Sequence, residues 1–134
     1  MVIALGSIKA MAAVDGLMRA LASRDDSVRT AAAWAVGEVK APRAVAPLVE
    51  ALHDGVGRVR AAAAKALGDI KDPSAVPALI AALGDRYVDI RQNAAWALGE
   101  LRDSHAAEAL SAVLNDPDPT ARRLAGQSLK KLRP

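Results

Sequence analysis

The sequence predicts an all-α solenoid of about four two-helix repeats, each 31 residues long. Gly6, Gly37, Gly68 and Gly99 are spaced 31 residues apart, and the segments around them agree: ALGSIK, AVGEVK, ALGDIK and ALGELR. Residues 28–58 also match residues 59–89 at 15 of 31 positions. A fixed period of this length indicates units that bury their apolar faces by stacking on their neighbours, which produces an elongated molecule with an extended surface.

We expect a single solenoid domain over residues 1–134, which the period divides into repeats. The parts are a half-repeat at 1–9 and repeats at 10–40, 41–71, 72–102 and 103–134. This number of units exceeds the three or so that a solenoid needs for stability. Residues 4–9 fall in register with residues 35–40, so we interpret the start of the chain as the end of a repeat helix and not as a targeting segment.

The first helix of a repeat is best marked in the unit 72–102. Asp72-Pro73 is a helix-start signal, because aspartate caps free N–H groups and proline needs no N–H partner there. An i, i+3, i+4, i+7 apolar stripe follows, made by Val76, Leu79, Ile80 and Leu83. Pro47 and Pro77 lie a few residues into their helices and predict an irregular first turn.

The second helix of each repeat carries one apolar stripe that we expect to be buried. The stripe residues are equivalent from unit to unit: Val28, Ala32, Val36 and Val39; Val59, Ala63, Leu67 and Ile70; Ile90, Ala94, Leu98 and Leu101. Asp118-Pro119 marks the start of the last second helix. The short loops between the helices predict antiparallel neighbours.

Two segments carry a resemblance to a known family: VRAAAAKALGDIKDPSAVPALIAALGD at 59–85 and IRQNAAWALGELRDSHAAEALSAVLND at 90–116. They resemble the short HEAT-like repeat of phycobilisome-lyase-type proteins, and the resemblance covers essentially the whole chain. It implies an armadillo-type superhelix in which the second helices line a concave groove. It implies no single activity, since the same repeat serves bilin lyases, hydroxylases, DNA glycosylase relatives and protein-binding modules.

The composition excludes several classes of function. Without cysteine, the chain has no disulfide, thiolate metal ligand, iron–sulfur cluster or thiol nucleophile. It is compatible with a reducing cytosol, and we expect a cytoplasmic protein. The formal net charge of +3 is too small to argue alone for nucleic acid or an anionic membrane. No apolar run approaches the roughly 20 residues of a membrane span, so we expect no membrane partner.

Few residues could support catalysis or metal binding. His53 and His105 are the only histidines, and neither lies in a His/Glu/Asp cluster with ligand-like spacing. HEAT-like iron hydroxylases use repeated His-Glu pairs, whereas this chain has a single His53-Asp54 pair. No nucleophile motif, phosphate loop or carboxylate pair stands out. We therefore expect no enzyme activity, no catalytic residue, no metal and no cofactor.

Two columns of charged residues repeat with the same period. Arg29, Arg60, Arg91 and Arg122 each follow the first apolar stripe position of a second helix, and Asp54, Asp85 and Asp116 precede the last three arginines by six residues. Arginine is suited to bridging carboxylates and carbonyls between stacked units. We interpret the columns as a structural ladder, and the alternative is an anion-binding row of arginines.

The strongest functional indication lies on the opposite side of the second helices. At about 100° per residue, Trp34 and Trp96 lie about 240° round their helices from Val28 and Ile90, away from the buried stripe. The predicted partner-binding residues on this concave face are Thr30, Trp34, Glu38, Ala61, Lys65, Asp69, Gln92, Trp96, Glu100, Arg123, Gln127 and Lys131. Tryptophan is frequent at interaction hot spots, although each indole could instead pack flat over the alanines of the neighbouring unit.

Among functions, we favour a non-catalytic scaffold that binds a protein or peptide with a basic and partly apolar element. The alternatives are a nucleic-acid-binding HEAT-like module and a bilin-lyase-like subunit that acts only with a partner. Glu38, Asp69 and Glu100 form an acidic row that would repel phosphates. Trp34 and Trp96, two units apart, are separated by about 20 Å, too far to sandwich one base.

The two ends of the solenoid are expected to differ. The last helix ends in cations that suit its negative end and give a polar cap: Arg122, Arg123, Lys130, Lys131 and Arg133. The first residues are apolar and correspond to half of a second helix. We expect either a fragment of a longer HEAT-like protein or self-association through residues 1–22.

Overall fold

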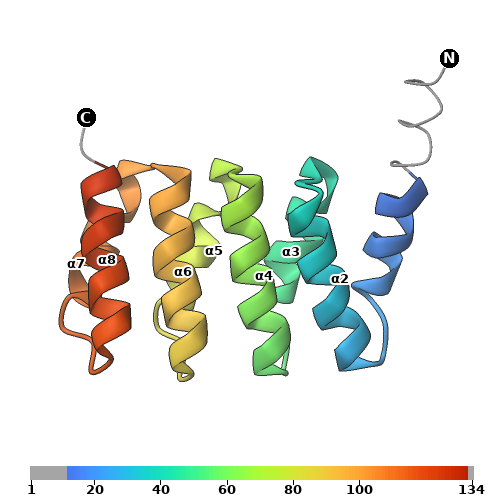
Figure 1. Ribbon diagram of the computed structural model, residues 1–134, viewed down its shortest axis with the longest axis horizontal. Coiled ribbons are helices and arrows are strands. Elements are labelled where there is room, and N and C mark those ends of the chain that lie inside the picture. Colours follow the sequence, from blue (N-terminus) through green and yellow to red (C-terminus); the bar gives the residue numbers. More distant parts are fainter. Residues whose placement is uncertain (1–11, 133–134) are drawn as a thin grey trace, which may run out of the picture.

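The computed structural model describes residues 12–132, and every regular element in that range is helical. Figure 1 shows the longer helices side by side in a row, with shorter helices behind them. This arrangement confirms the α-solenoid predicted from the 31-residue period. The predicted half-repeat at 1–9 lies outside the described residues.

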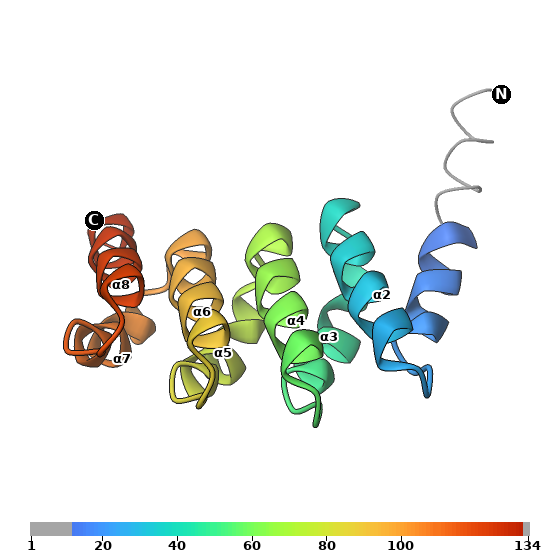
Figure 2. The same cartoon turned by 60° about the horizontal axis from the view of Figure 1, so that its bottom comes forward.

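The repeats combine a short first helix with a long second helix. The second helices are α2 (Asp26–Glu38), α4 (Gly57–Ile70), α6 (Val88–Leu101) and α8 (Pro119–Lys131). The first helices are α3 (Val45–Ala51), α5 (Val76–Ala82) and α7 (Ala107–Val113), and residues 12–20 form the helix that precedes α2. The second helices pack on one another in sequence, while α3, α5 and α7 pack on α4, α6 and α8. Two layers result, as the turned view in Figure 2 shows.

The first helices begin with a tight turn, but this turn lies before Pro47 and Pro77 and not at them. The 3₁₀ turns η1 (Pro42–Ala44), η2 (Pro73–Ala75) and η3 (Ser104–Ala106) precede α3, α5 and α7. The irregular backbone therefore lies before Pro47 and Pro77. Both prolines stand in the first turn of their α-helices, where a missing N–H removes no intrahelical hydrogen bond.

Both predicted aspartate caps are confirmed. The carboxylate of Asp72 accepts a hydrogen bond from the Ser74 N–H at 2.9 Å, and that of Asp118 accepts one from the Ala121 N–H at 2.8 Å. Each aspartate thereby satisfies an N–H group that has no partner within its helix.

The predicted stripes supply most of the core. Its largest fully buried side chains are Val36, Leu48, Val59, Leu67, Leu79, Ile90, Leu98 and Leu110. Ile70 and Leu101 are only partly buried. The prediction was wrong for Val28 and Val39, which are 40% and 56% exposed. The equivalents of Val28 in α4 and α6 are covered by the preceding second helix, whereas no second helix precedes α2 within residues 12–132.

This open face of α2 adjoins an apolar hollow. The hollow has a volume of about 420 Å³, and its apolar lining includes Leu17, Ala20, Val28, Ala31 and Ala35. Self-association through residues 1–22 stays a prediction, because residues 1–11 of that segment lie outside the described part of the chain.

The recurring glycines mark the closest approach of successive second helices. A Cβ atom on Gly37 in α2 would lie 2.8 Å from the Cα atom of Ala66 in α4. One on Gly99 in α6 would lie 2.9 Å from the Cα atom of Ser128 in α8. Real Cβ atoms do not approach a backbone this closely, so the glycine column is required by helix packing.

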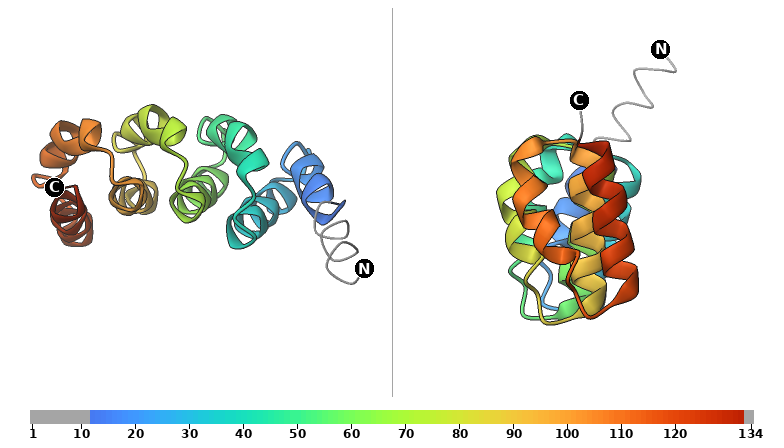
Figure 3. Two further views of the ribbon diagram at one scale, coloured as in Figure 1. Left: turned by 90° about the horizontal axis from the view of Figure 1, so that it is seen from above. Right: turned by 90° about the vertical axis from the view of Figure 1, so that its left-hand side faces the viewer.

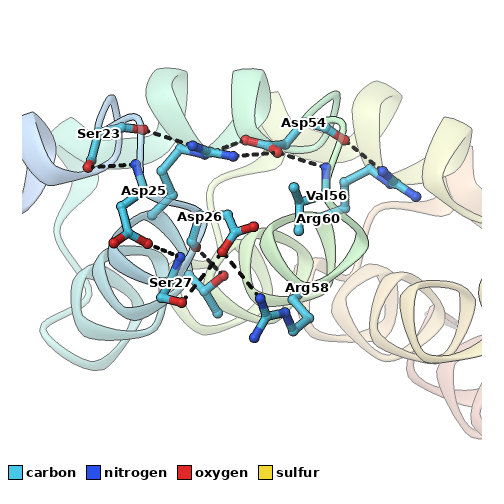
Figure 4. Close-up of polar contacts among 10 residues, drawn as sticks. Ser23, Asp25, Asp26, Ser27, Asp54, Val56, Arg58 and Arg60 are labelled. Atoms are coloured by element: carbon cyan, nitrogen blue, oxygen red, sulfur yellow. Dashed lines mark hydrogen bonds and ion pairs between the residues drawn. The ribbon is translucent and has the colours of Figure 1, made fainter.

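The arginine and aspartate columns form the predicted structural ladder between repeats. Arg60 donates from Nε and Nη2 to the two carboxylate oxygens of Asp85, at 2.8 and 3.3 Å. Its Nη1 donates to the main-chain carbonyl of Asp54 at 2.6 Å, a contact that Figure 4 shows. The pairs Arg29–Asp54 and Arg91–Asp116 repeat the bidentate arrangement. Arg29, Arg60 and Arg91 thus each join the turns of two successive units.

Acidification is expected to weaken the ladder only below about pH 4. Partial burial raises the pKa of Asp54 and Asp85, but hydrogen bonds from their arginine partners and from backbone N–H groups outweigh it, so each pKa lies below the ordinary value of 3.8. A depressed folded-state pKa contributes stability that is present above the unfolded-state pKa and is lost as the pH falls through the folded-state value. Urea midpoints should therefore stay level from about pH 7 to about pH 4 and fall below it. A decline that begins near pH 6 would contradict this assignment.

A third column appears at the ends of the second helices. Lys40, Lys71 and Arg102 adopt the left-handed backbone conformation, with φ of 52°, 64° and 53°. This conformation costs a non-glycine residue about 1 kcal/mol. The positive side chains suit the negative end of a helix and favour this position electrostatically.

The two rows of helices bend into a shallow arc. Seen from above in Figure 3, the second helices lie on the inner side of the arc. The faces of α2, α4, α6 and α8 that point away from the first helices therefore line the concave surface.

Within residues 12–132, none of the helices has the length and apolar character of a membrane span.

Candidate partner-binding surface on the second helices

The concave face repeats one side-chain position on each second helix. We call this the central row: Trp34 on α2, Lys65 on α4, Trp96 on α6 and Gln127 on α8. The helices lie side by side (Figure 1), so these side chains follow one another across the surface. Trp34 is 47% exposed, Gln127 is exposed, and Lys65 and Trp96 are half-buried. The row is accessible to solvent along its length.

Lys65 connects the two tryptophans of the central row. Its Nζ atom lies 5.4 Å from the ring centroid of Trp34 and 5.0 Å from that of Trp96, within the range of cation–π attraction. The same ammonium donates to both carboxylate oxygens of Asp69, at 2.8 and 3.0 Å. Trp34, Lys65, Trp96 and Asp69 therefore form one connected group across three helices. The expected separation of about 20 Å is wrong for the two indole rings, because both side chains reach toward the same ammonium between them.

The packing interpretation applies in part to Trp96. A Cβ atom on Gly68 would lie 2.4 Å from Cζ3 of the Trp96 ring, so the indole rests on the backbone of α4. Only glycine at position 68 leaves room for the Trp96 ring to lie against the backbone of α4. The Trp96 ring is thus both packed on the neighbouring unit and accessible to solvent, while Trp34 is the more exposed of the two.

Lysines neutralise part of the acidic row that was expected beside the tryptophans. Asp69 is paired with Lys65, and Glu100 accepts from Lys131 at 2.6 Å. The hydrogen bond from Lys131 lowers the pKa of Glu100. Glu38 is exposed and makes no ion pair within residues 12–132. Two of the three carboxylates are therefore paired with lysines. Lys65 and Asp69 lie one turn apart on α4, whereas Lys131 reaches Glu100 from the neighbouring helix.

The third row lies one turn nearer the start of each helix and comprises Thr30, Ala61, Gln92 and Arg123. The Thr30 hydroxyl donates to the Asp26 carbonyl at 2.8 Å, and Gln92 Nε2 donates to the Asp118 carboxylate at 2.7 Å. Arg123 is exposed, and the other three are half-buried. The face thus runs from a carboxylate, Glu38, on α2 to a guanidinium on α8.

The sequence did not single out Asn93, which bonds to a residue of this surface, or Tyr87, which lies away from the central row. Asn93 Nδ2 donates to the carbonyl of Ala61 at 2.9 Å, across from α6 to α4. Asn93 interrupts a position that holds alanine in the two preceding units, which was a usable signal. Tyr87 is 48% exposed at the start of α6 and lies against Arg60 and Arg86. It occupies a cap position that is aspartate in α2 and α8.

The histidines lie apart from this surface. His53 is exposed, and His105 is exposed and contacts Asp103 two residues earlier, with Nδ1 2.6 Å from the carboxylate. In the range that the structure describes, no group of three or more His, Cys, Asp or Glu side chains could hold a metal ion.

Comparison with protein-family models identifies the repeat. The model for HEAT repeats matches twice, over residues 1–67 and 56–130. The chain belongs to the HEAT-repeat family. A comparison with curated protein sequences gives no match.

Solved structures similar to this HEAT-repeat chain include two natural proteins and a designed one. The CpcE–CpcF complex of phycocyanin lyase from Nostoc sp. PCC7120 is 31% identical, with a TM-score of 0.82 over 89% of this chain and 53% of that chain. Human deoxyhypusine hydroxylase is 25% identical, with a TM-score of 0.74 over 96% of this chain and 46% of that chain. A designed armadillo repeat protein, at 19% identity, has a TM-score of 0.78 over 91% of this chain and 65% of that chain, and shows the fold alone. The chain spans about half the length of the two natural relatives.

HEAT repeats are in general scaffolds, and their extended surfaces bind other molecules. The lyase complex and the hydroxylase show that the same fold also occurs in enzymes. The fold therefore leaves the activity of this chain to be argued from its own surface residues.

Proposed function

We propose that this HEAT-repeat chain is a non-catalytic interaction scaffold whose concave face binds a protein or peptide with a basic and apolar element. The observation that carries the proposal is the central row. Both tryptophans of the chain stand on this one face, and Trp34 is 47% exposed. An exposed indole offers a large apolar contact area and a ring face that attracts cations. Tryptophan accordingly dominates many interaction hot spots.

Charge favours a basic element in the partner. Glu38 lies one helical turn from Trp34 on the same face of α2, and it is exposed and without an ion pair among the described residues. A cation of the partner could contact the Trp34 ring and pair with Glu38 at once. The concave-face residues present no nucleophile paired with a general base, and this supports binding without catalysis.

Capture of a partner should depend on the two tryptophans. The double variant Trp34→Ala, Trp96→Ala is expected to lower the amount of partner captured from a lysate by at least about tenfold, because each truncation removes a hot-spot contact. Tyr87→Ala is the matched control, since it removes a similarly exposed aromatic side chain outside the central row. It should leave capture unchanged. A double variant that keeps its helical circular dichroism and captures the same partner equally well would contradict the proposal.

A second candidate function is a lyase-like subunit that acts only with a partner subunit. The 31% identity to the phycocyanin lyase complex favours it. A change in bilin absorbance on mixing with this chain would support this candidate.

A nucleic-acid-binding module is the less favoured alternative, because the net charge is only +3 and carboxylates lie along the concave face. Salt-dependent retardation of DNA would support it instead.

A further inference from the structure

Lys65 occupies the place on the concave face where a cation of a partner is expected. Its ammonium lies 5.4 and 5.0 Å from two indole centroids and within 3.0 Å of both oxygens of Asp69. Aromatic ring faces and a carboxylate are the groups with which proteins bind organic cations. The chain thus contains an assembled cation site that is filled by its own side chain.

The walls of this site are held by the fold. The Trp96 ring is seated on the backbone at Gly68 of α4, and Asp69 follows Lys65 by one turn of the same helix. Side chains mounted on packed helices keep their geometry better than side chains on loops. The Lys65 side chain is less constrained, because it is long and has rotatable bonds. Within residues 12–132 its ammonium donates hydrogen bonds to Asp69 alone.

We propose that Trp34, Trp96 and Asp69 form an arginine-binding site in which Lys65 is a built-in competitor. A partner arginine displaces Lys65, stacks on the indoles and pairs with the Asp69 carboxylate. This inference rests on the proposed function, because it names the residue type that the same surface recognises. No bond is made or broken in the exchange.

Arginine fits the exchange better than lysine. Its planar guanidinium stacks on aromatic faces, pairs with a carboxylate through two hydrogen bonds and is more weakly hydrated than an ammonium. The displaced Lys65 regains its hydration and its rotamer freedom. It also leaves a second positive charge near the bound arginine, so Lys65 should weaken binding both by competition and by repulsion.

The test compares the wild type with Lys65→Ala and Lys65→Gln, using an octa-arginine and an octa-lysine peptide as probes. The two tryptophans are the only ones in the chain, so their emission reports on the site directly. Both variants should bind octa-arginine about fivefold more tightly than the wild type, as expected for a cation–π site freed of its competitor. Octa-lysine should gain less. Adding Asp69→Asn to Lys65→Ala should remove the gain. Lys130→Ala, which removes an exposed cation from the last helix, is the charge-matched control and should change the affinity by less than about twofold.

Equal or weaker octa-arginine binding by both Lys65 variants would overturn the inference, as would a gain of the same size in Lys130→Ala. Absence of binding in every variant would overturn it as well. The proposed function would survive these results if capture of the partner still depended on Trp34 and Trp96. Conversely, if the Trp34→Ala, Trp96→Ala variant captures the partner as well as the wild type, the proposed function is rejected, regardless of the peptide affinities.

Discussion

Replacing Gly37 with alanine is expected to destabilise the folded protein by about 1–3 kcal/mol, the usual cost of overpacking a close contact. The new Cβ would lie 2.8 Å from both the Cα and the Cβ of Ala66. Because a Cα atom is part of the backbone, α2 and α4 would have to move apart to accommodate it. Helix propensity alone predicts the opposite result, a gain of about 1 kcal/mol for alanine over glycine.

Gly126→Ala is the matched control for this prediction. Gly126 also lies inside a second helix, α8, but a Cβ there would lie 3.9 Å from Cδ2 of Leu114, the nearest atom outside that helix, which is an ordinary contact. This variant should be more stable than the wild type by about 0.5–1 kcal/mol. Urea unfolding followed by circular dichroism measures both changes. Stabilisation by both substitutions would show that the glycine column is not required by packing between the helices.

Replacing Arg60 with alanine is expected to destabilise the protein by about 2–3 kcal/mol, since hydrogen bonds to charged groups contribute about this much. The side chains of Arg60 and Asp85 are only 12% and 13% exposed. The substitution leaves the Asp85 carboxylate without its guanidinium partner, and it also removes the hydrogen bond to the carbonyl of Asp54. The loss should appear as a lower urea midpoint with an unchanged slope.

Arg122→Ala provides the comparison within the same column. Arg122 donates to the carbonyls of Asp116 and Pro117, and no carboxylate pairs with it within residues 12–132. Its loss should cost under about 1 kcal/mol. A similar loss of stability in both variants would mean that the paired carboxylates contribute little and that the carbonyl contacts carry the ladder.

Much of the fold could be predicted because the relevant signals are local. The caps at Asp72 and Asp118 act within a few residues, and the buried stripe through Val59, Ala63 and Leu67 follows from the angular period of a single helix. The ladder of arginines and aspartates between repeats was also predictable, because a strict period repeats each interface between units, although only the structure shows that Arg60 pairs with Asp85.

The candidate site was predictable only in outline. The sequence indicated which residues of each second helix face away from the core, including Trp34 and Lys65. Helix spacing also suggested about 20 Å between Trp34 and Trp96, whereas Lys65 Nζ lies 5.4 and 5.0 Å from the two indole centroids. The balanced charges of Asp69 and Glu100 were therefore not predicted. Packing of Trp96 on the neighbouring unit was stated only as an alternative to binding, and its contact with the backbone at Gly68 was not predicted.

The sequence by itself determined the repeat unit, the helix type and the face on which each side chain stands, because these depend on the period of 31 and on the geometry of one α-helix. The tertiary structure alone decided how closely α2 and α4 approach at Gly37, that Val28 is exposed, and how Lys65 comes to lie within reach of both indoles. These features depend on the offset and spacing between stacked helices, and packing across the whole solenoid sets that spacing.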